Sequence, residues 1–568
     1  MRTSTLRRRL VAALAATGAA LALPAVLPTA AHAADASDVV LVGHGWGHGR
    51  GAGQYGAYGY VVDLGWPYTK VLDHYYGGTR MATMGNPTIG VRLLTTASDT
   101  WLTSAKDFTI GGYRVSAGSG ARILWDTTRN TWRLQTRYDG CTGSTVAWET
   151  NAKSTTASLV ASGTTLADTL VVCGNGRGYL GTFSWVRDGS YTRLVNNVPM
   201  ESYLRGVVPS ESPASWGDAR NGWGIEALKV QAVAARSYAW AEHRYSYAKT
   251  CDTTSCQVYG GLTYRGASVA DPRTDKAILA TAGQVRVNSS GVVQLTEFSS
   301  STGGYTAGGT FPAIRDDGDR HSPNHTWTVR VPGASIASSY GVGTFKQLAV
   351  VSSNGLGGSG RVLSLDVVGT TRTVRTTGTD FAARFGLKSS WFFPALQPVQ
   401  QATNVRYVRL AHAPEVYRLF SGPDGSWTDR GWVTGDDYTA SGRPPVTVVR
   451  ASYVRLAWSS TVYAVYQWPG EPYPQVDQLS TTTWQSLGSP TPTVVGNVYG
   501  TMWYRYDGEK AVYAETPNYS EAPHHVSPAE WSAAQAAGAV QVVRPSRTAA
   551  PTRAYSAKPW QAVVIPRG

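Results

Sequence analysis

Apolar and polar residues alternate with a period of two along much of the chain, which is the pattern of a β-strand with one buried face. Within residues 88–208 the alternation occurs at 89–94 and 132–138, and it returns at 362–368. Turn-forming pairs such as Asp188-Gly189 separate these stretches. We therefore expect an α+β fold that is predominantly β.

One stretch has helical spacing instead. Apolar residues recur there as Ile225, Leu228, Ala232, Ala235 and Ala239, with Ala227, Ala234 and Tyr238 on a neighbouring face. A helix that is apolar on most sides is usually buried. We predict a central buried helix over this stretch and a later, shorter helix over Thr377–Phe385.

A single carboxylate precedes the predicted central helix. Glu211 lies in the run 207–216, which is otherwise rich in Val, Pro and Trp and carries almost no charge. Such surroundings desolvate a carboxyl group and raise its pKa, as a general acid requires. We predict that Glu211 sits on a loop held by the helix. Glu201, Glu226 and Glu297 are weaker candidates, and a cap or salt bridge is the expected role of Glu226.

Beyond residue 400 the chain repeats itself with a step of 46 residues. Tyr407-Val408-Arg409-Leu410 recurs as Tyr453-Val454-Arg455-Leu456, and Tyr438 corresponds to Trp484 and then to Trp531. Copies this short cannot bury a core alone, so we expect three copies to pack together. They would form a separate C-terminal β-rich repeat domain over 399–545, after a linker at 397–404 and before a tail at 546–568.

Residues 1–33 have the features of an export signal. Arginines at the start precede an apolar, Ala-rich segment, and Ala31-His32-Ala33 has the form of a cleavage site. The pair Arg7-Arg8 leaves both general and twin-arginine export open. We expect cleavage near Ala33 and no membrane span in the mature chain, because no later apolar run is long enough.

The cysteine count suits an exported protein. The four cysteines form an even set, which predicts two disulfides in an oxidising compartment. Their proximity in the sequence favours the pairs Cys141–Cys173 and Cys251–Cys256.

Length and charge limit the possible roles. The chain has 568 residues, so two or more domains are expected. Its formal net charge of +14 favours an anionic partner. Nucleic acid is not expected, because the Lys and Arg residues are scattered and no nucleic-acid motif is present.

A glycine-rich segment, 43–59, stands near the start of the mature chain. It lacks the pattern of a phosphate-binding loop. His44 and His48 could ligate a metal, but without a third ligand at useful spacing we expect them to pack or to form hydrogen bonds, and we expect no metal.

Four blocks of the chain resemble the sporulation stage II protein D family: 203–211, 226–239, 256–261 and 298–306. The resemblance implies lytic transglycosylase or amidase-enhancer activity in the bacterial cell wall, with Glu211 as acid and base. Some members bind zinc near Cys251 and Cys256, but Ser255 stands where those members carry His. We therefore expect no cofactor.

The glycine-rich segment resembles a block of the same family that usually ends the domain. Here it comes first, so either the domain 34–398 is closed from the other end, as in a circular permutation, or the block is a portable wall-binding element. We favour the first, because chain termini commonly lie close together. It would place His44, His48 and Gln54 near Glu211.

A single carboxylate suffices for a lytic transglycosylase. The 6-hydroxyl of N-acetylmuramic acid attacks its own anomeric carbon, so neither water nor a second carboxylate is needed. A serine nucleophile is not expected, because no G-x-S-x-G elbow is present. Candidate substrate-binding residues in these blocks are Gln231, Arg236, Gln257, Tyr259, Ser299 and Ser301, together with the residues of the glycine-rich segment.

The expected function is therefore that of a secreted, wall-associated lytic transglycosylase that acts on peptidoglycan glycan strands. The alternative is a non-catalytic wall-binding protein that enhances an amidase. Expected partners are glycan strands, anionic wall polymers and a cell-wall amidase. In the repeats, the equivalent Trp484 and Trp531 are predicted to be core residues. Sugar stacking is predicted for the other tryptophans, Trp432, Trp458, Trp468 and Trp503.

Overall fold

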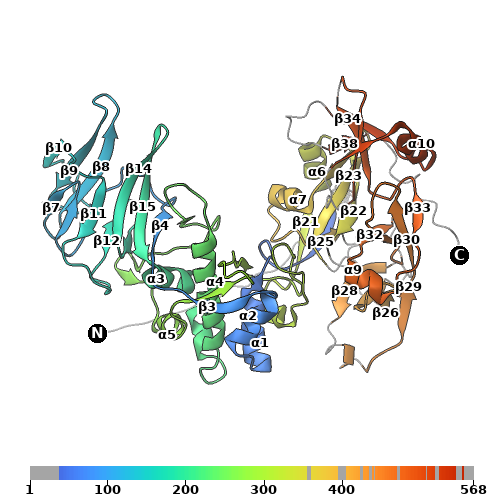
Figure 1. Ribbon diagram of the computed structural model, residues 1–568, viewed down its shortest axis with the longest axis horizontal. Coiled ribbons are helices and arrows are strands. Elements are labelled where there is room, and N and C mark those ends of the chain that lie inside the picture. Colours follow the sequence, from blue (N-terminus) through green and yellow to red (C-terminus); the bar gives the residue numbers. More distant parts are fainter. Residues whose placement is uncertain are drawn as a thin grey trace, which may run out of the picture.

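The computed structural model describes residues 38–354, 360–394, 404–421, 427–433, 438–439, 442–469, 474–506, 508–517, 523–544 and 553–555. The expected export signal lies outside these residues, as does nearly all of the expected linker. Figure 1 shows two lobes. The first contains the sheets and helices between β4 and α5, and the second contains the strands from β21 onwards.

Two antiparallel-rich sheets build the first lobe (Figure 1). One has the strand order β16 (Thr250–Cys251), β4 (Thr88–Arg92), β15 (Tyr191–Pro199), β14 (Thr182–Asp188), β11 (Thr156–Leu159), β6 (Phe108–Ile110), β7 (Tyr113–Val115). The other has the order β10 (Trp148–Asn151), β9 (Thr131–Arg137), β8 (Gly120–Asp126), β5 (Leu102–Thr103), β12 (Leu170–Val172), β13 (Arg177–Tyr179), β17 (Thr263–Tyr264), β18 (Ala267–Ser268).

The two sheets share one hydrophobic core. Alternate residues of their strands point inward, such as Phe183 and Trp185 of β14 and Ile123 of β8, and all three are buried. Tyr203 and Leu204 from α3 extend the same core. The period-two pattern at 89–94 and 132–138 correctly predicted β4 and β9, and the expectation of a predominantly β fold is confirmed.

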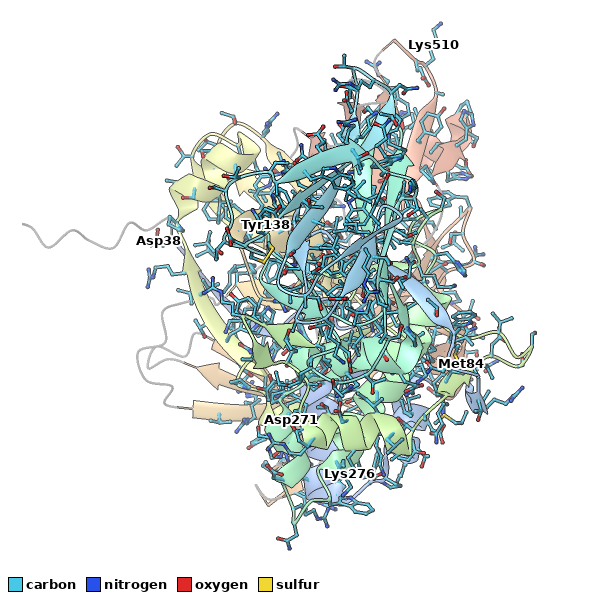
Figure 2. The ribbon with its side chains drawn as sticks, turned by 90° about the vertical axis from the view of Figure 1, so that its left-hand side faces the viewer. Asp38, Met84, Tyr138, Asp271, Lys276 and Lys510 are labelled. Carbon is cyan, nitrogen blue, oxygen red and sulfur yellow. A yellow bond between two sulfur atoms is a disulfide. The ribbon has the colours of Figure 1, made fainter. Side chains whose placement is uncertain are left out.

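Helices gather at one end of this lobe. They are α1 (Gln54–Leu64), α2 (Tyr68–Tyr75), α3 (Met200–Glu211), α4 (Ile225–Ala241) and α5 (Pro272–Ala280), with the 3-10 turn η1 (Ala214–Asp218). Figure 2 looks onto the strands, with Tyr138 among them, and shows Asp271 and Lys276 of the α5 region at the helical end. Helix α4 contacts the other four helices and η1, and most of its residues are buried.

Short sheets connect the glycine-rich segment to the rest of the chain. β2 (Ala52–Gly53) pairs in parallel with β20 (Phe298–Ser299), and β3 (Arg80–Thr83) pairs with β19 (Gln284–Val287). β1 (Val39–His44) lies between β21 (Thr326–Val331) and β25 (Phe392–Pro394). The turn η2 (Asp317–His321) packs against α1.

The second lobe contains an eight-stranded sheet that crosses the expected domain boundary at residue 398. Its order is β33 (Thr493–Val495), β30 (Ala451–Leu456), β31 (Tyr463–Tyr466), β32 (Gln475–Gln478), β22 (Phe345–Ser353), β23 (Val362–Gly369), β24 (Thr373–Thr376), β38 (Arg553–Tyr555). Helices α6 (Gly333–Tyr340) and α7 (Gly378–Phe385) pack on its β22–β23 part. A separate repeat domain is therefore not confirmed, and part of the expected tail is a strand of this sheet.

The three copies have the same plan, in which three antiparallel strands are followed by a strand parallel to the first. The first copy has the order β28 (Trp427–Val433), β27 (Val416–Ser421), β26 (Asn404–Leu410), β29 (Val446–Val449). The third has the order β36 (His524–Val526), β35 (Val512–Glu515), β34 (Met502–Tyr506), β37 (Gln541–Arg544). Short helices α9 (Thr481–Ser486) and α10 (Pro528–Ala536) carry the equivalent tryptophans of copies two and three.

The expected roles of the repeat tryptophans need correction. Trp468 and Trp503, which were predicted to stack on sugars, are 1% and 2% exposed and belong to the core. Trp484 and Trp531 are half-buried and pack edge-on or tilted against Tyr453 and Trp503. Trp468 packs between copies one and two and Trp503 between copies two and three, whereas Trp458 is half-buried and stacks on His524. The side chain of Trp432 lies outside the described residues.

Both predicted disulfides, Cys141–Cys173 and Cys251–Cys256, are confirmed, and no cysteine is free. The first joins the β9–β10 connection to the end of β12, and the second closes a short loop after β16. In the described part of the chain, no helix combines the length and apolar character that a membrane crossing needs.

Candidate active site

Glu211 is the last residue of α3, so the prediction of a loop is wrong. The β-branched and proline residues around it concealed the helix, which tolerates Pro209 in its last turn. The Ser210 hydroxyl donates a hydrogen bond to the Gly206 carbonyl, which is one of the backbone acceptors near the end of the helix. The helix ends here because Ser212, which precedes Pro213, has an extended backbone.

Two donors hold the half-buried Glu211 carboxyl. The backbone N–H of Val258 donates to Oε1 at 2.6 Å, and Gln54 Nε2 donates to Oε2 at 3.4 Å. Burial raises the pKa of Glu211 above its ordinary value, and these two hydrogen bonds hold part of that rise back. The result is a carboxyl group that retains its proton to higher pH than a free glutamate does.

Gln54 and Gln231 extend the site, as the sequence predicted. Gln54 begins α1, Gln231 lies on α4, and the Gln54 amide donates to Gln231 Oε1 at 3.3 Å. The Ser212 hydroxyl donates to the same oxygen. Within the described structure, Gln231 Nε2 is buried without a hydrogen-bond partner. A donor in that state favours any acceptor that a small rearrangement brings to it.

The glycine-rich segment approaches the neighbouring backbone closely. Gly45 has a φ of 75°, and a Cβ there would lie 2.7 Å from the Ser301 carbonyl oxygen. Trp46 and Ser301 exchange backbone hydrogen bonds in the same place. Together with the β2–β20 pairing, this contact joins the glycine-rich segment to the Ser-rich block at 298–301.

The two histidines of the segment do not contact Glu211. His44 packs at a tilt against Trp391 and lies edge-on to His325. Burial, and then the charge of His325, lower the pKa of His44 to about 3. His48 is exposed, and its Nδ1 accepts from the Arg50 backbone N–H. Of the three residues expected near Glu211 from this segment, only Gln54 is in contact with it.

Ser299 and Ser301 are buried and make structural hydrogen bonds. Ser299 Oγ accepts from the Gly49 backbone N–H at 3.1 Å. Ser301 Oγ donates to Asp319, which is buried and also accepts from the Gly303 backbone N–H and lies 2.9 Å from His325 Nδ1. The contact of Ser301 with Asp319 joins the Ser-rich block to η2. Neither serine hydroxyl is hydrogen-bonded to Glu211.

Arg236, Gln257 and Tyr259 also have internal partners, so direct substrate contact is not supported for them. Arg236 is fully buried in a two-bond pair with Glu201. The remaining two, Gln257 and Tyr259, are in the core: Gln257 bridges Tyr203 OH and the Ala235 carbonyl, while Tyr259 OH donates to Asn196 Oδ1. Their motif positions reflect the packing that surrounds the site.

The rival carboxylates are all paired. Glu201 binds Arg236, Glu226 binds Lys229 and accepts from the Tyr68 backbone N–H, and Glu297 binds Arg50 at 2.6 Å. A salt bridge was the role expected of Glu226. In the described part of the chain no second carboxylate is paired with Glu211.

Two groups near Glu211 were not predicted as parts of the site. The N–H of Val258 is a backbone donor, which no residue type reveals. The aromatic cluster of Tyr55, Tyr58 and Trp216 beside Gln54 is the other, with Tyr58 stacked on Trp216 at 4.7 Å. Spacing of i and i+3 on α1 could have indicated that Tyr55 and Tyr58 share a face. Among the described residues, no group of three or more His, Cys, Asp and Glu side chains could hold a metal ion.

Part of the chain around this site is similar to a known family. Residues 188–287, which include α3 and α4, match the model of SpoIID, the stage II sporulation protein. The resemblance is thereby confirmed. The matched residues contain Glu211, Gln231 and Val258, but not Gln54, which the glycine-rich segment supplies.

Two relatives match parts of this SpoIID-like chain. It is 36% identical over 132 residues to the amidase enhancer of Bacillus subtilis (strain 168), an alignment that covers 22% of this chain and 16% of that protein. It is 33% identical over 140 residues to an uncharacterized protein of Brachyspira hyodysenteriae, covering 23% and 33%. The chain thus spans a third or less of either relative. No solved structure matches it.

Proposed function

We propose that this protein is an exported lytic transglycosylase of the bacterial cell wall, which cleaves the bond between N-acetylmuramic acid and N-acetylglucosamine. The observation that supports this most is the state of Glu211: a half-buried carboxyl with a raised pKa, held by two donors and without a carboxylate partner. The SpoIID match and the amidase enhancer relative support a role in the cell wall.

In the proposed mechanism Glu211 acts alone. Its protonated carboxyl donates to the glycosidic oxygen, and the bond from that oxygen to the anomeric carbon of the muramic acid breaks. The 6-hydroxyl of the same sugar then attacks that carbon and transfers its proton to the Glu211 carboxylate, which restores the acid. The product is a 1,6-anhydro sugar, no water is consumed, and Val258 and Gln54 orient the carboxyl throughout.

Mass spectrometry of purified wall glycan digested by the protein tests this proposal. Anhydro-terminated fragments, lighter by one water than hydrolysed ones, are expected. Glu211→Gln should abolish them, a loss of at least about 10²-fold, because the amide cannot donate a proton to the leaving oxygen. Glu297→Gln tests the rival carboxylate, and Glu149→Gln, on an exposed strand of the first lobe, is the matched control. Reducing-end products or an active Glu211→Gln would contradict the mechanism.

The second candidate is a wall-binding protein that enhances an amidase. The name of the Bacillus subtilis relative favours it. In that case the chain alone would release no glycan fragments, whereas adding it to a wall amidase would increase stem-peptide release, and Glu211→Gln would enhance as well as the wild type. These outcomes separate the two candidates in one set of digests.

We further propose that the repeats and the net charge of +14 keep the protein on anionic wall polymers. A truncation at residue 398 is a poor test, because it would remove strands from the shared sheet. Binding of the full chain to walls with and without their anionic polymers is cleaner. Binding should fall when those polymers are removed and when salt is raised, and equal binding to both walls would contradict the proposal.

A further inference from the structure

The hydrogen bond from Val258 to Glu211 depends on a short segment between β16 and the core. Val258 supplies the closest contact of the Glu211 carboxyl, at 2.6 Å, through a backbone group. The side chains on either side of it are tied down: Gln257 bridges Tyr203 and the Ala235 carbonyl, and Tyr259 binds Asn196. The core of the first lobe therefore helps to orient this N–H through the residues on both sides of Val258.

Upstream of Gln257, a covalent loop also ties this segment to the sheet. The disulfide Cys251–Cys256 ends two residues before Val258. Cys251 is fully buried and belongs to β16, which pairs in parallel with β4. The short segment from β16 to Val258 is thus tied to the sheet by a covalent bond, which local unfolding does not break.

Asp252 closes the same loop from within. Its carboxylate is 2% exposed and accepts from the Leu94 backbone N–H at 2.6 Å and from the Thr95 hydroxyl at 2.5 Å. Its own backbone carbonyl accepts from the Tyr259 N–H. One residue therefore links the end of β4, the disulfide loop and the residue that follows Val258.

We propose that the Cys251–Cys256 disulfide, together with Asp252, is a positioning element for Glu211: it fixes the Val258 N–H so that the carboxyl keeps one orientation. The proposal rests on the function proposed above. A loop of five residues contributes less to stability than a long one does, since it removes little entropy from the unfolded chain. The position of the disulfide, two residues before Val258, explains its presence better than a contribution to stability does.

The positioning role has a signature that general destabilisation lacks. The Val258 hydrogen bond lowers the pKa of Glu211, against the larger effect of burial. If the loop is opened and this bond weakens, the pKa of Glu211 rises. A general acid is active while protonated, so the alkaline limb of the pH–rate profile moves to higher pH. The maximal rate falls at the same time, because the carboxyl is no longer held in place.

The test compares two double variants of the full chain, Cys251→Ala/Cys256→Ala and the control Cys141→Ala/Cys173→Ala. The first should lower the maximal rate of anhydro-sugar formation by up to about 100-fold and shift the alkaline limb upward. It should also speed hydrogen exchange at the Val258 amide. The control should leave the limb and that exchange rate unchanged, because its disulfide joins the β9–β10 connection to the end of β12, in the other sheet from β16.

An unshifted limb together with unchanged exchange at Val258, or the same response from both variants, would overturn the proposal. If circular dichroism shows that the first variant is unfolded, Asp252→Asn takes its place, and the same shift and exchange are expected. If the wild type forms no anhydro sugars, the proposed function fails, and the exchange comparison still decides whether the loop positions Val258.

Discussion

The region around Glu211 and the repeat region are stabilised in different ways. At Glu211 each polar partner comes from a distant part of the chain, as for Gln54, which is 157 residues away. In the repeats some packed aromatic pairs lie within one copy, as for Tyr453 with Trp484, and others join neighbouring copies, as for Tyr417 with Trp468. The first region consists of polar groups held by single hydrogen bonds from separate segments, and the second of apolar groups packed within and between neighbouring copies.

The difference shows where precision is needed. The half-buried equivalent position of each copy tolerates a choice among aromatic residues, since Tyr438, Trp484 and Trp531 occupy it in turn. Buried polar groups must each find a partner with correct geometry, and closing long loops to do so costs entropy. The site is therefore expected to be sensitive to geometry, and the repeats to lost volume.

Removing volume from the repeats should have the largest effect. Trp503→Ala deletes a 2%-exposed side chain of the core that copies two and three share with β22, and should cost about 3–5 kcal/mol of unfolding free energy. Urea unfolding measures this. Trp46→Ala, at a 52%-exposed position, is the control and should cost under about 0.5 kcal/mol. If both substitutions lowered the free energy of unfolding equally, the expected sensitivity of the repeats to lost volume would be contradicted.

Breaking a buried ion pair near the site should come next. Glu201→Gln leaves Arg236, which is fully buried, without its counter-charge, and should cost about 3–5 kcal/mol. The same change at Glu149, whose Arg133 partner lies on the surface of the strands, should cost under about 1 kcal/mol. Denaturant unfolding of both variants gives the comparison, and a mild effect of Glu201→Gln would show that the pair is dispensable.

Loss of Cys141–Cys173 should cost more stability than loss of Cys251–Cys256. Loss of Cys251–Cys256 should have the larger effect on the position of the Val258 N–H. From loop closure, loss of Cys141–Cys173, with a separation of 32, should cost about 4 kcal/mol, and loss of Cys251–Cys256, with a separation of 5, about 2 kcal/mol. Calorimetry of the two double variants tests this order. A larger loss for the short loop would mean that it stabilises the fold through contacts rather than through chain entropy.

The smallest effect concerns pH. Asp316 is fully buried beside Asp319, and burial, followed by that neighbouring charge, raises the pKa of its carboxyl well above the ordinary value. The folded state therefore binds this proton more tightly than the unfolded chain does. The resulting stabilisation is complete below the unfolded pKa and is lost as pH rises toward the folded pKa, by at most about 1.4 kcal/mol per pH unit.

Asp316→Asn removes this titration while keeping the hydrogen-bond partners Tyr75 and Thr302. Unfolding free energies measured at pH 5 and pH 7 should fall less between the two values for the variant than for the wild type. Identical slopes would show that Asp316 does not titrate in this range.

Several features of this protein follow from the sequence alone, because they are local or periodic. The alternation of residues in β14 and β15 and the helical spacing in α4 each require only neighbouring residues. The three copies are recognised because similar residues recur along the sequence. The disulfides are predicted because the cysteines form pairs that are close in sequence, in a chain expected to be exported. The candidacy of Glu211 rests on its apolar surroundings within ten residues, and that of Gln54 and Gln231 on family motifs.

Tertiary structure decided which of the motif residues face the site. Arg236, Gln257 and Tyr259 have the residue types of a binding site, yet burial and internal partners place them in the core. The helix that ends at Glu211 depends on packing that overrides the preferences of Val and Pro. The donor from Val258 is a backbone group, identical in every residue type except proline. The position of this N–H depends on tertiary contacts between distant segments, which the identity of the residue does not reveal.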